Sequence, residues 1–333
     1  MKLSLALTTA LGLALALALG GYFGFAEISN GLASVGWGVL LVIAFHPLQM
    51  IYSALGWRVL LPVERPPRLS TLLGVRWIRE AVNNLLPVAQ IGGEFVGARL
   101  LRRVGVPLAA GGASAAVDLT MEMVSQIIFT LLGLALLIPG LHETRILPWM
   151  IGAIALAAVV VSLFIVAQRF GLFHLVERAL VRLVERGSLW SSLGEIGGLH
   201  RAIVVLYAAP ARLGLACGYH LISWLLGGLE VMLALYLVGV SVDFREGLII
   251  ESLGQAVRAV GFAIPGSLGV QEGGYILICG LLGISPQAAI ELSLLKRIRE
   301  VVLGLPALIA WHAIETRQLV TRVGAAAAGA DRE

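Results

Sequence analysis

Apolar residues run along this chain in stretches long enough to cross a lipid bilayer. Runs of about 20 apolar residues have the length of a transmembrane helix, and they predict spans at 3–25, 33–60, 146–168 and 212–240. Two further runs, 108–139 and 286–313, are as long but carry charged residues. The first run follows Lys2, but its apolar core is longer than that of a signal peptide, so we interpret it as a membrane anchor.

Two other apolar stretches, 70–104 and 246–284, are interrupted near their middle by proline and glycine. Each half is shorter than a full span. Broken helices are tolerated at membrane depth only where they pack inside protein or line a cavity. We therefore predict that each stretch is a re-entrant helical hairpin, which enters and leaves the membrane on the same side.

The chain also resembles itself at an offset of 178 residues. Pro87 then falls on Pro265 and Glu94 on Glu272, since 87 + 178 = 265 and 94 + 178 = 272. The same register aligns further pairs, namely Ala81-Val82 with Ala259-Val260, Gly105 with Gly283, and Glu122 with Glu300. Because three spans separate the two hairpins, the hairpins must face opposite sides of the membrane. The predicted fold is an all-α polytopic membrane protein with two inverted repeats, each span-span-hairpin-span, and about six full spans plus two hairpins.

This pattern divides the chain into four parts. Residues 1–168 hold the first repeat together with the span that opens the second, and 212–316 hold the remainder of the second repeat. Residues 317–333 form a tail. The polar segment 169–211 has apolar positions at helical spacing opposite basic ones, as in an amphipathic helix on the inner leaflet. A plain linker is the equal alternative for that segment.

Composition excludes several classes of protein. Apolar residues make up 59% of the 333 residues and charged residues 13%, against about 45–50% and about 25% in typical soluble domains. A soluble enzyme, a nucleic-acid-binding protein and a disordered chain are therefore not expected. By the positive-inside rule, the predicted spans put both termini in the cytoplasm. The arginines that fix this orientation are Arg58, Arg65, Arg68, Arg102, Arg103, those of 169–212, Arg317 and Arg322.

The densest group of membrane charges lies on the inbound helix of the first hairpin. Its polar residues fall at i, i+3, i+4 and i+7, which is one helix face: Arg76, Arg79, Glu80, Asn83 and Asn84. Pro87 ends that helix, Gly93 allows a tight reversal, and Glu94 follows it. Arginines beside backbone N–H groups suit an anionic lipid headgroup. The alternative is an internal ion pair between Arg79 and Glu94 that holds the hairpin closed, and both can hold together.

The second hairpin has fewer charges and more glycine, with Arg258, Pro265, Gly269 and Glu272 as its counterparts. Glu272 is interpreted as a partner of Arg258 or Arg299, or as a protonatable carboxylate. Two charged stripes occupy the last spans of the two halves. One comprises Asp118, Glu122 and Gln126, and the other Lys296, Arg299 and Glu300. We expect the two stripes to face and neutralise each other.

Other candidate chemistry is sparse. His46, His220 and His312 show no spacing that predicts a metal site, and each is interpreted as a satisfied interior or interfacial histidine. No Walker A sequence, H-E-x-x-H or G-x-S-x-G is present. We therefore expect no cofactor, no metal and no ATP hydrolysis. An active site made from the hairpin carboxylates and arginines remains an open alternative.

Two segments carry a resemblance to a known family. They are RWIREAVNNLLPVAQIGGEFVGAR at 76–99 and PGSLGVQEGGY at 265–275. With them the chain resembles the lysylphosphatidylglycerol synthase transmembrane-region, or flippase-like, family, and most of all its hopanoid-associated HpnL branch. The family's motif positions correspond to Arg79, Glu80, Asn83, Asn84, Pro87, Gly93, Glu94, Pro265, Gly269 and Glu272.

The resemblance is to a family of bacterial membrane proteins, and it implies lipid translocation across the cytoplasmic (inner) membrane. We expect a flippase-like translocase, not an enzyme, that moves a phospholipid or hopanoid-related lipid between leaflets without ATP. The aminoacyl-transferase half of the related phospholipid-modifying proteins has no counterpart here, so headgroup aminoacylation is not expected. The alternatives are an integral-membrane enzyme acting on a lipid phosphate and a non-catalytic assembly subunit of hopanoid biosynthesis. Expected partners are a membrane lipid, other hopanoid-biosynthesis membrane proteins and a second copy of the chain.

Overall fold

A computed structural model describes residues 35–86, 92–140, 162–169, 198–261 and 267–330, with a few single positions between them. Every regular element in this part of the chain is a helix, as the sequence predicts. The elements are η1 (Gly36–Gly38), α3 (Val39–Val59), α4 (Leu69–Leu85), α5 (Gly92–Arg103), α6 (Leu108–Leu137), η2 (Ile138–Gly140), α10 (Leu199–Tyr207), α11 (Pro210–Leu237), α12 (Phe244–Val260), α13 (Val270–Leu281) and α14 (Pro286–Ala330).

Among the described residues, three helical stretches are long and apolar enough to cross a membrane, namely Gly36–Val59, Leu108–Leu137 and Pro210–Leu237. They coincide with the predicted spans 33–60, 108–139 and 212–240. The chain is therefore a multi-pass membrane protein. The predicted spans 3–25 and 146–168 lie outside the described residues, apart from a few positions of the second, and so does most of the predicted linker 169–211. Helix α14 begins with the predicted span 286–313 but continues to Ala330, so no helix end marks the predicted boundary at 316.

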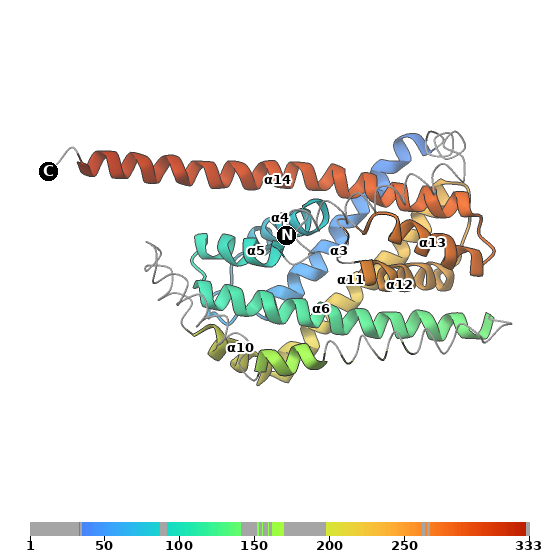
Figure 1. Ribbon diagram of the computed structural model, residues 1–333, viewed down its shortest axis with the longest axis horizontal. Coiled ribbons are helices and arrows are strands. Elements are labelled where there is room, and N and C mark those ends of the chain that lie inside the picture. Colours follow the sequence, from blue (N-terminus) through green and yellow to red (C-terminus); the bar gives the residue numbers. More distant parts are fainter. Residues whose placement is uncertain are drawn as a thin grey trace.

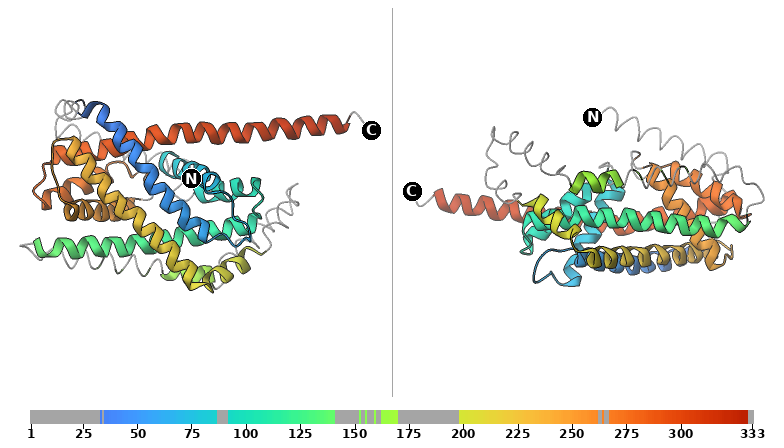
Figure 2. Two further views of the ribbon diagram at one scale, coloured as in Figure 1. Left: turned by 180° about the vertical axis from the view of Figure 1, so that it is seen from behind. Right: turned by 90° about the horizontal axis from the view of Figure 1, so that it is seen from below.

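Helices α3 and α11 run side by side through the middle of the molecule in opposite directions (Figures 1 and 2). Their contacts establish the antiparallel order, because Gln49 bonds to Glu230 while Ser53 bonds to Ser223. The long helices α6 and α14 lie along opposite edges (Figure 1). The pair α4 and α5 fills the space toward one end, and the pair α12 and α13 fills it toward the other (Figure 1).

Each predicted hairpin contains two short helices that pack against each other, α4 with α5 and α12 with α13. Helix α4 stops where the sequence requires, because the residue before a proline avoids the helical region. Leu86, which precedes Pro87, is extended with φ −102° and ψ 149°. In the second pair, Gly269 has a positive φ of 76° immediately before α13, a conformation that glycine adopts without strain.

The bounds of these helices repeat along the chain. Helices α5 and α13 begin and end 178 residues apart, since 92 + 178 = 270 and 103 + 178 = 281. The starts of α6 and α14 and the ends of α3 and α11 keep the same offset. Packing partners correspond as well: α4 lies against α5 and α14, and α12 lies against α13 and α6.

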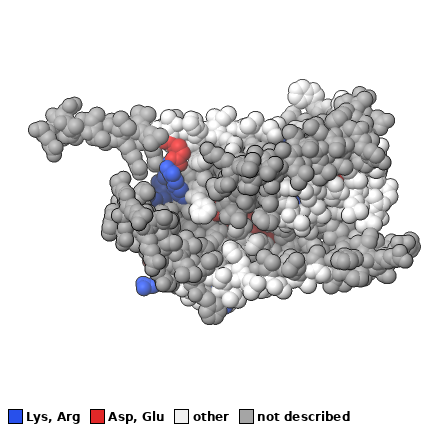
Figure 3. Space-filling model, viewed as in Figure 1, with Lys and Arg blue, Asp and Glu red and all other residues white. Residues whose placement is uncertain are grey.

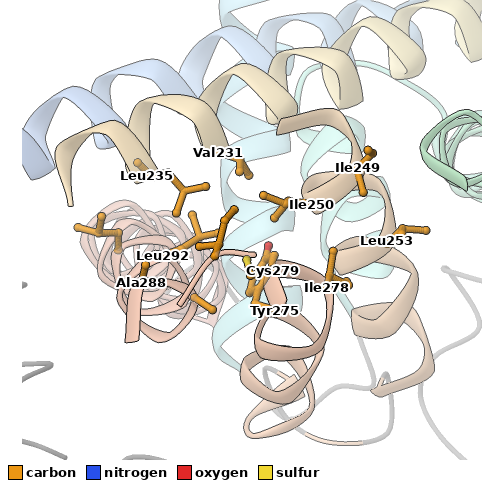
Figure 4. Close-up of a cluster of buried hydrophobic side chains, with 14 of the residues drawn as sticks. Val231, Leu235, Ile249, Ile250, Leu253, Tyr275, Ile278, Cys279, Ala288 and Leu292 are labelled. Carbon is orange, nitrogen blue, oxygen red and sulfur yellow. The ribbon is translucent and has the colours of Figure 1, made fainter. Parts of the chain in front are cut away.

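Apolar packing holds the second helix pair in place. A buried cluster joins α11, α12, α13 and α14 around Val231, Ile250, Tyr275 and Leu292 (Figure 4). A second cluster, which includes Leu72, Val75 and Leu101, joins α4 to α5. On the face shown in Figure 3, most of the described residues are uncharged, and a group of charged residues lies at one end. Several charged side chains are buried between the helices, among them Arg76, Arg79, Asp118, Glu230, Lys296 and Arg299.

Candidate functional site

The polar face of α4 is buried against α6. Arg76 donates to both carboxylate oxygens of Glu122, at 2.8 and 3.3 Å, and lies 3.4 Å from Asp118. Arg79 donates to the same Asp118 at 2.6 Å. A guanidinium group offers five N–H donors in a planar fork, so two arginines one turn apart can share these two carboxylates.

Arg79 also closes the first helix pair. Its Nε lies 2.6 Å from Glu94 in the first turn of α5, and its guanidinium stacks 5.0 Å from the ring of Trp57. Asn83 completes the contact, because its Oδ1 accepts from the Gly93 N–H at 2.7 Å and its Nδ2 donates to Glu94 at 3.3 Å. The predicted Arg79–Glu94 ion pair is therefore present.

The second helix pair is held by different partners from those we predicted. Glu272 accepts from the backbone N–H of Gly269 at 2.6 Å, from Ser293 at 3.2 Å and from Arg297 at 3.4 Å. The interpretation that Glu272 pairs with Arg258 or Arg299 is wrong. Its cationic partner is Arg297, which lies one turn from Ser293 on the face of α14 that packs against α13. Arg258 instead donates to Glu300 at 2.5 Å.

A group of central residues links the two halves of the molecule. His46 of α3 contacts Glu80 of α4 at 2.6 Å and Glu230 of α11 at 3.5 Å. Glu230 also accepts from Gln49 at 2.6 Å and forms an ion pair with Arg299 of α14. One further bond joins the two helix pairs directly, from Arg258 to the side-chain oxygen of Asn84 at 3.0 Å.

The two charged stripes do not neutralise each other, so that prediction is wrong. The acidic stripe on α6 pairs with the arginines of α4, and His220 of α11 adds a contact to Asp118 at 2.9 Å. In the basic stripe, Lys296 pairs with Glu251 of α12. The reason is geometric, because the short helix pairs lie between the stripes and supply the partners.

We call these paired groups the charge network. It contains six cationic side chains, Arg76, Arg79, Arg258, Lys296, Arg297 and Arg299. It contains eight carboxylates, Glu80, Glu94, Asp118, Glu122, Glu230, Glu251, Glu272 and Glu300. An unpaired charge at the membrane centre costs about 2.5–3.5 kcal/mol on insertion scales. Mutual pairing removes most of that cost.

The network leaves almost no free space. The cavity beside it has a volume of about 10 Å³, which is room for about one water molecule. Its lining includes His46, Glu80, Asn84, Arg299 and Glu300. A group larger than a water molecule could therefore enter this cavity only if helices separated and ion pairs broke.

The structure brings most of the predicted site residues together. Arg76, Arg79, Asn83, Gly93 and Glu94 meet in the first helix pair. Gly269, Glu272, Arg258 and Glu300 lie in or beside the second, and Glu80, Asn84 and Arg299 lie between the two pairs. Pro87 and Pro265 lie outside the described residues. Glu94 and Glu272 do not meet each other, because each bonds to its own half.

Sequence reasoning named Glu230 and Glu251 only as charges inside the membrane, and it missed three members of the site: His46, His220 and Arg297. The histidines were interpreted as isolated because no spacing pairs them for a metal site. The signal available was their position inside an apolar span, where a polar side chain needs a partner from another helix. Among the described residues, no group of three or more His, Cys, Asp and Glu side chains is arranged to hold a metal ion.

The match to a family model decides the relationship of this chain to known proteins. The model of the lysylphosphatidylglycerol synthase TM region matches residues 9–307, which include both helix pairs and the whole charge network. The chain belongs to this family. Neither a curated protein nor a solved structure matches the chain. As a member of the lysylphosphatidylglycerol synthase TM-region family, it is a multi-pass membrane protein.

Proposed function

We propose that the protein is a lipid translocase of the bacterial cytoplasmic membrane, which moves a phospholipid or hopanoid-related lipid between leaflets without ATP. The observation that carries the proposal is the charge network. It is buried between two pairs of short helices in a bundle that is otherwise apolar. The family supports a lipid as the substrate, since its name refers to a synthase of a phospholipid.

The arrangement of helices supports transport in particular. Helices α3 and α11 are antiparallel, and the helix pairs lie toward opposite ends of the bundle (Figure 1). With the constant offset of 178 residues, this is the arrangement expected of two inverted repeats. Secondary transporters commonly bind substrate where broken helices of such repeats meet near the midplane. On this proposal the two helix pairs are re-entrant, and both chain termini are cytoplasmic.

The network offers a lipid headgroup the chemistry that it needs. A phosphate can replace the Glu122 carboxylate at the guanidinium group of Arg76. Both anions have two oxygens that accept parallel N–H bonds from a guanidinium, although the carboxylate is planar and the phosphate tetrahedral. A headgroup amine can replace a guanidinium beside Glu94 or Glu272. The lipid then exchanges its ionic contacts with those of the protein, and no charge crosses the membrane unpaired.

Lipid exchange in reconstituted vesicles tests the proposal. The protein is placed in liposomes of phosphatidylglycerol and phosphatidylethanolamine that carry a trace of fluorescent phosphatidylglycerol, and dithionite quenches the outer leaflet. We expect the protein to make the inner-leaflet signal accessible, and Glu94→Gln to slow this several-fold without loss of folding. Glu64→Gln is the matched control, because Glu64 is exposed in the α3–α4 connection. Equal rates with and without protein would contradict translocation of phosphatidylglycerol.

The same preparation discriminates the alternatives. A lipid-phosphate enzyme using the network carboxylates as acid and base would form product in detergent, where no leaflets exist. An assembly subunit would co-purify with another membrane protein and tolerate Glu94→Gln. Product formed in detergent would favour the enzyme over the translocase. A stable protein partner, together with a Glu94→Gln variant that behaves as the wild type, would favour the assembly subunit.

A further inference from the structure

His46 has contacts that a satisfied interior histidine does not need. It lies in the apolar helix α3 and is buried. Its Nε2 lies 2.6 Å from Glu80, and its Nδ1 lies 3.5 Å from Glu230. The second distance is longer than a usual N–H···O bond, and this buried Nδ1 has no hydrogen-bond partner. One ring thus stands between two carboxylates from different helices, with one nitrogen bonded and the other close to a second acceptor.

The two carboxylates differ in their access to water. The side chain of Glu80 is 25% exposed and lines the small cavity, whereas that of Glu230 is 0% exposed. His46 therefore connects a partly exposed carboxylate beside the cavity with a fully buried one. An imidazole can carry a proton on either nitrogen, and on both when it is charged.

The charge count of the network supports a proton at this position. The network holds six cationic side chains and eight carboxylates, so 8 − 6 = 2 negative charges are not matched. Two histidines contact these carboxylates, His46 and His220. Protonation of both would balance the network, and an unmatched buried charge is costly.

The charged groups that face His46 come from each helix around it. They are Glu80 from α4, Glu230 from α11, and Arg299 and Glu300 from α14. The acidic residues of α6 are held by Arg76 and Arg79. Of these four groups, Arg299 also links two helices, because its ion pair with Glu230 joins α14 to α11.

We propose that His46 is a proton-binding residue that passes a proton between Glu80 and Glu230, and that the proton is the coupling ion of this protein. The coupling role rests on the translocase proposed above. A proton from water reaches Nε2 through Glu80, and the ring becomes charged with both nitrogens protonated. The Nδ1 proton then passes to Oε2 of Glu230, which leaves a neutral ring and a neutral carboxylic acid. Release follows the reverse steps.

The consequence for the helices follows from the loss of one charge. When Glu230 is neutral, Arg299 loses its ion-pair partner and keeps only its longer contact to Glu300 at 3.8 Å. The link between α11 and α14 is then weaker. Proton binding would favour movement of α14, which also lines the cavity together with α3 and α4, and would so open the cavity to a headgroup.

The proton site is tested first without any lipid transport. The protein is labelled with nitrogen-15 histidine and placed in nanodiscs of phosphatidylglycerol and phosphatidylethanolamine, and His46→Gln assigns the His46 signal among the six histidines. We expect the His46 ring nitrogens to titrate, with both protonated in the charged form, and Glu80→Gln to change that titration. The ring signals of the exposed His312 should be the same with and without Glu80→Gln. A His46 ring that stays neutral at every pH, or one indifferent to Glu80→Gln, would overturn the proposal.

The pH profile of lipid exchange tests the coupling. In the vesicle assay, the wild-type rate should change several-fold with pH, and the profile should flatten in His46→Gln and in Glu80→Gln. His312→Gln is the matched control and should keep the wild-type profile. Variants are compared only if they elute as folded protein and unfold at a similar temperature, and Glu80→Gln serves if His46→Gln does not fold. An unchanged profile in both variants would overturn the relay and leave the translocase. No exchange at any pH, with His46 titrating as expected, would overturn the translocase and its coupling and leave the proton site.

Discussion

At the scale of single residues, Arg79 is the member of the network with the most varied contacts. It binds Glu94 of α5 and Asp118 of α6 and stacks on Trp57 of α3, so three helices meet at one guanidinium. Its side chain is 2% exposed. Removing one partner of a buried ion pair leaves the other charge uncompensated, which is more costly than the pair is stabilising.

Replacing Arg79 with alanine should therefore lower stability sharply. We expect a loss of about 3–5 kcal/mol, the usual cost of breaking a buried pair, measured as thermal unfolding in detergent. Arg99→Ala is the matched control. Arg99 also pairs with a glutamate, Glu315, but its side chain is 64% exposed, and exposed pairs contribute about 0–1 kcal/mol. Similar melting temperatures for the two variants would show that the Arg79 contacts do not carry stability.

The sequence predicted the members of the network on α4 and α5 better than their long-range partners. Arg79 and Glu94 share one hairpin, so local spacing brings them together. His46 and Glu230 come from helices that meet only in the folded bundle, and they are 184 positions apart in the chain, since 230 − 46 = 184. Helical periodicity reports which residues share a face of one helix, and it contains no information on which other helix that face meets.

At the scale of helices, the closest approach in the first pair occurs at Gly93. A Cβ atom there would lie 2.3 Å from the carbonyl oxygen of Arg79 and 2.8 Å from Oδ1 of Asn83. The backbones of α4 and α5 can approach this closely only because the residue is glycine. The same approach lets the Gly93 N–H reach Asn83 and sets the position of Glu94.

Gly93→Ala should push α5 away from α4. Overpacking of this kind costs about 1–3 kcal/mol, and the Arg79–Glu94 pair should weaken with it, which thermal unfolding and lipid exchange would both report. Gly74→Ala on α4 is the control, since a Cβ there meets nothing within 4 Å. It should be neutral or stabilise by up to about 1 kcal/mol, because alanine favours helix over glycine. A destabilised Gly74→Ala, or a neutral Gly93→Ala, would contradict the argument.

Helix bounds were the most accurately predicted feature at this scale. Pro87 and the glycines around 92 and 269 are local signals, and local signals decide where a helix stops. The length of α14 was not predicted. Residues 317–330 follow the predicted apolar span and were therefore interpreted as a tail, but they are rich in alanine, which favours helix.

At the scale of the whole molecule, the proposed lipid translocation requires that the two halves of the bundle move relative to each other. The contact between α4 of the first half and α14 of the second is the one to test. Trp77 of α4 donates to the carbonyl oxygen of Leu303, and a Cβ built on Gly304 would lie 3.7 Å from the Cβ of Ala81. This separation falls within the range of about 3.5–4.5 Å found in disulfides. The same Cβ built on Gly304 would lie 2.4 Å from Cδ1 of Leu85, so the end of that side chain must move in a Gly304→Cys variant. The contact also borders the cavity beside the network.

A disulfide between cysteines at 81 and 304 should therefore lock the bundle. In a background with Cys217 and Cys279 replaced by alanine, Ala81→Cys with Gly304→Cys should cross-link on oxidation, stop lipid exchange and recover it on reduction. Each single cysteine variant is the control and should exchange lipid under both conditions. Full exchange by the cross-linked protein would show that α4 and α14 stay together during transport, and the proposed opening beside the cavity would be wrong.

The separation along the chain between an arginine and the side chain that it bonds to has a consequence for biogenesis. Arg79 finds Asp118 only 39 residues later, within the first half, whereas Arg258 reaches back 174 residues to Asn84. As the ribosome delivers helices to the insertion machinery in order, the arginines of α4 can be neutralised by α6 before α11 is made. A defect in Asp118 would therefore act during synthesis, and such a chain would meet membrane quality control before its second half had emerged.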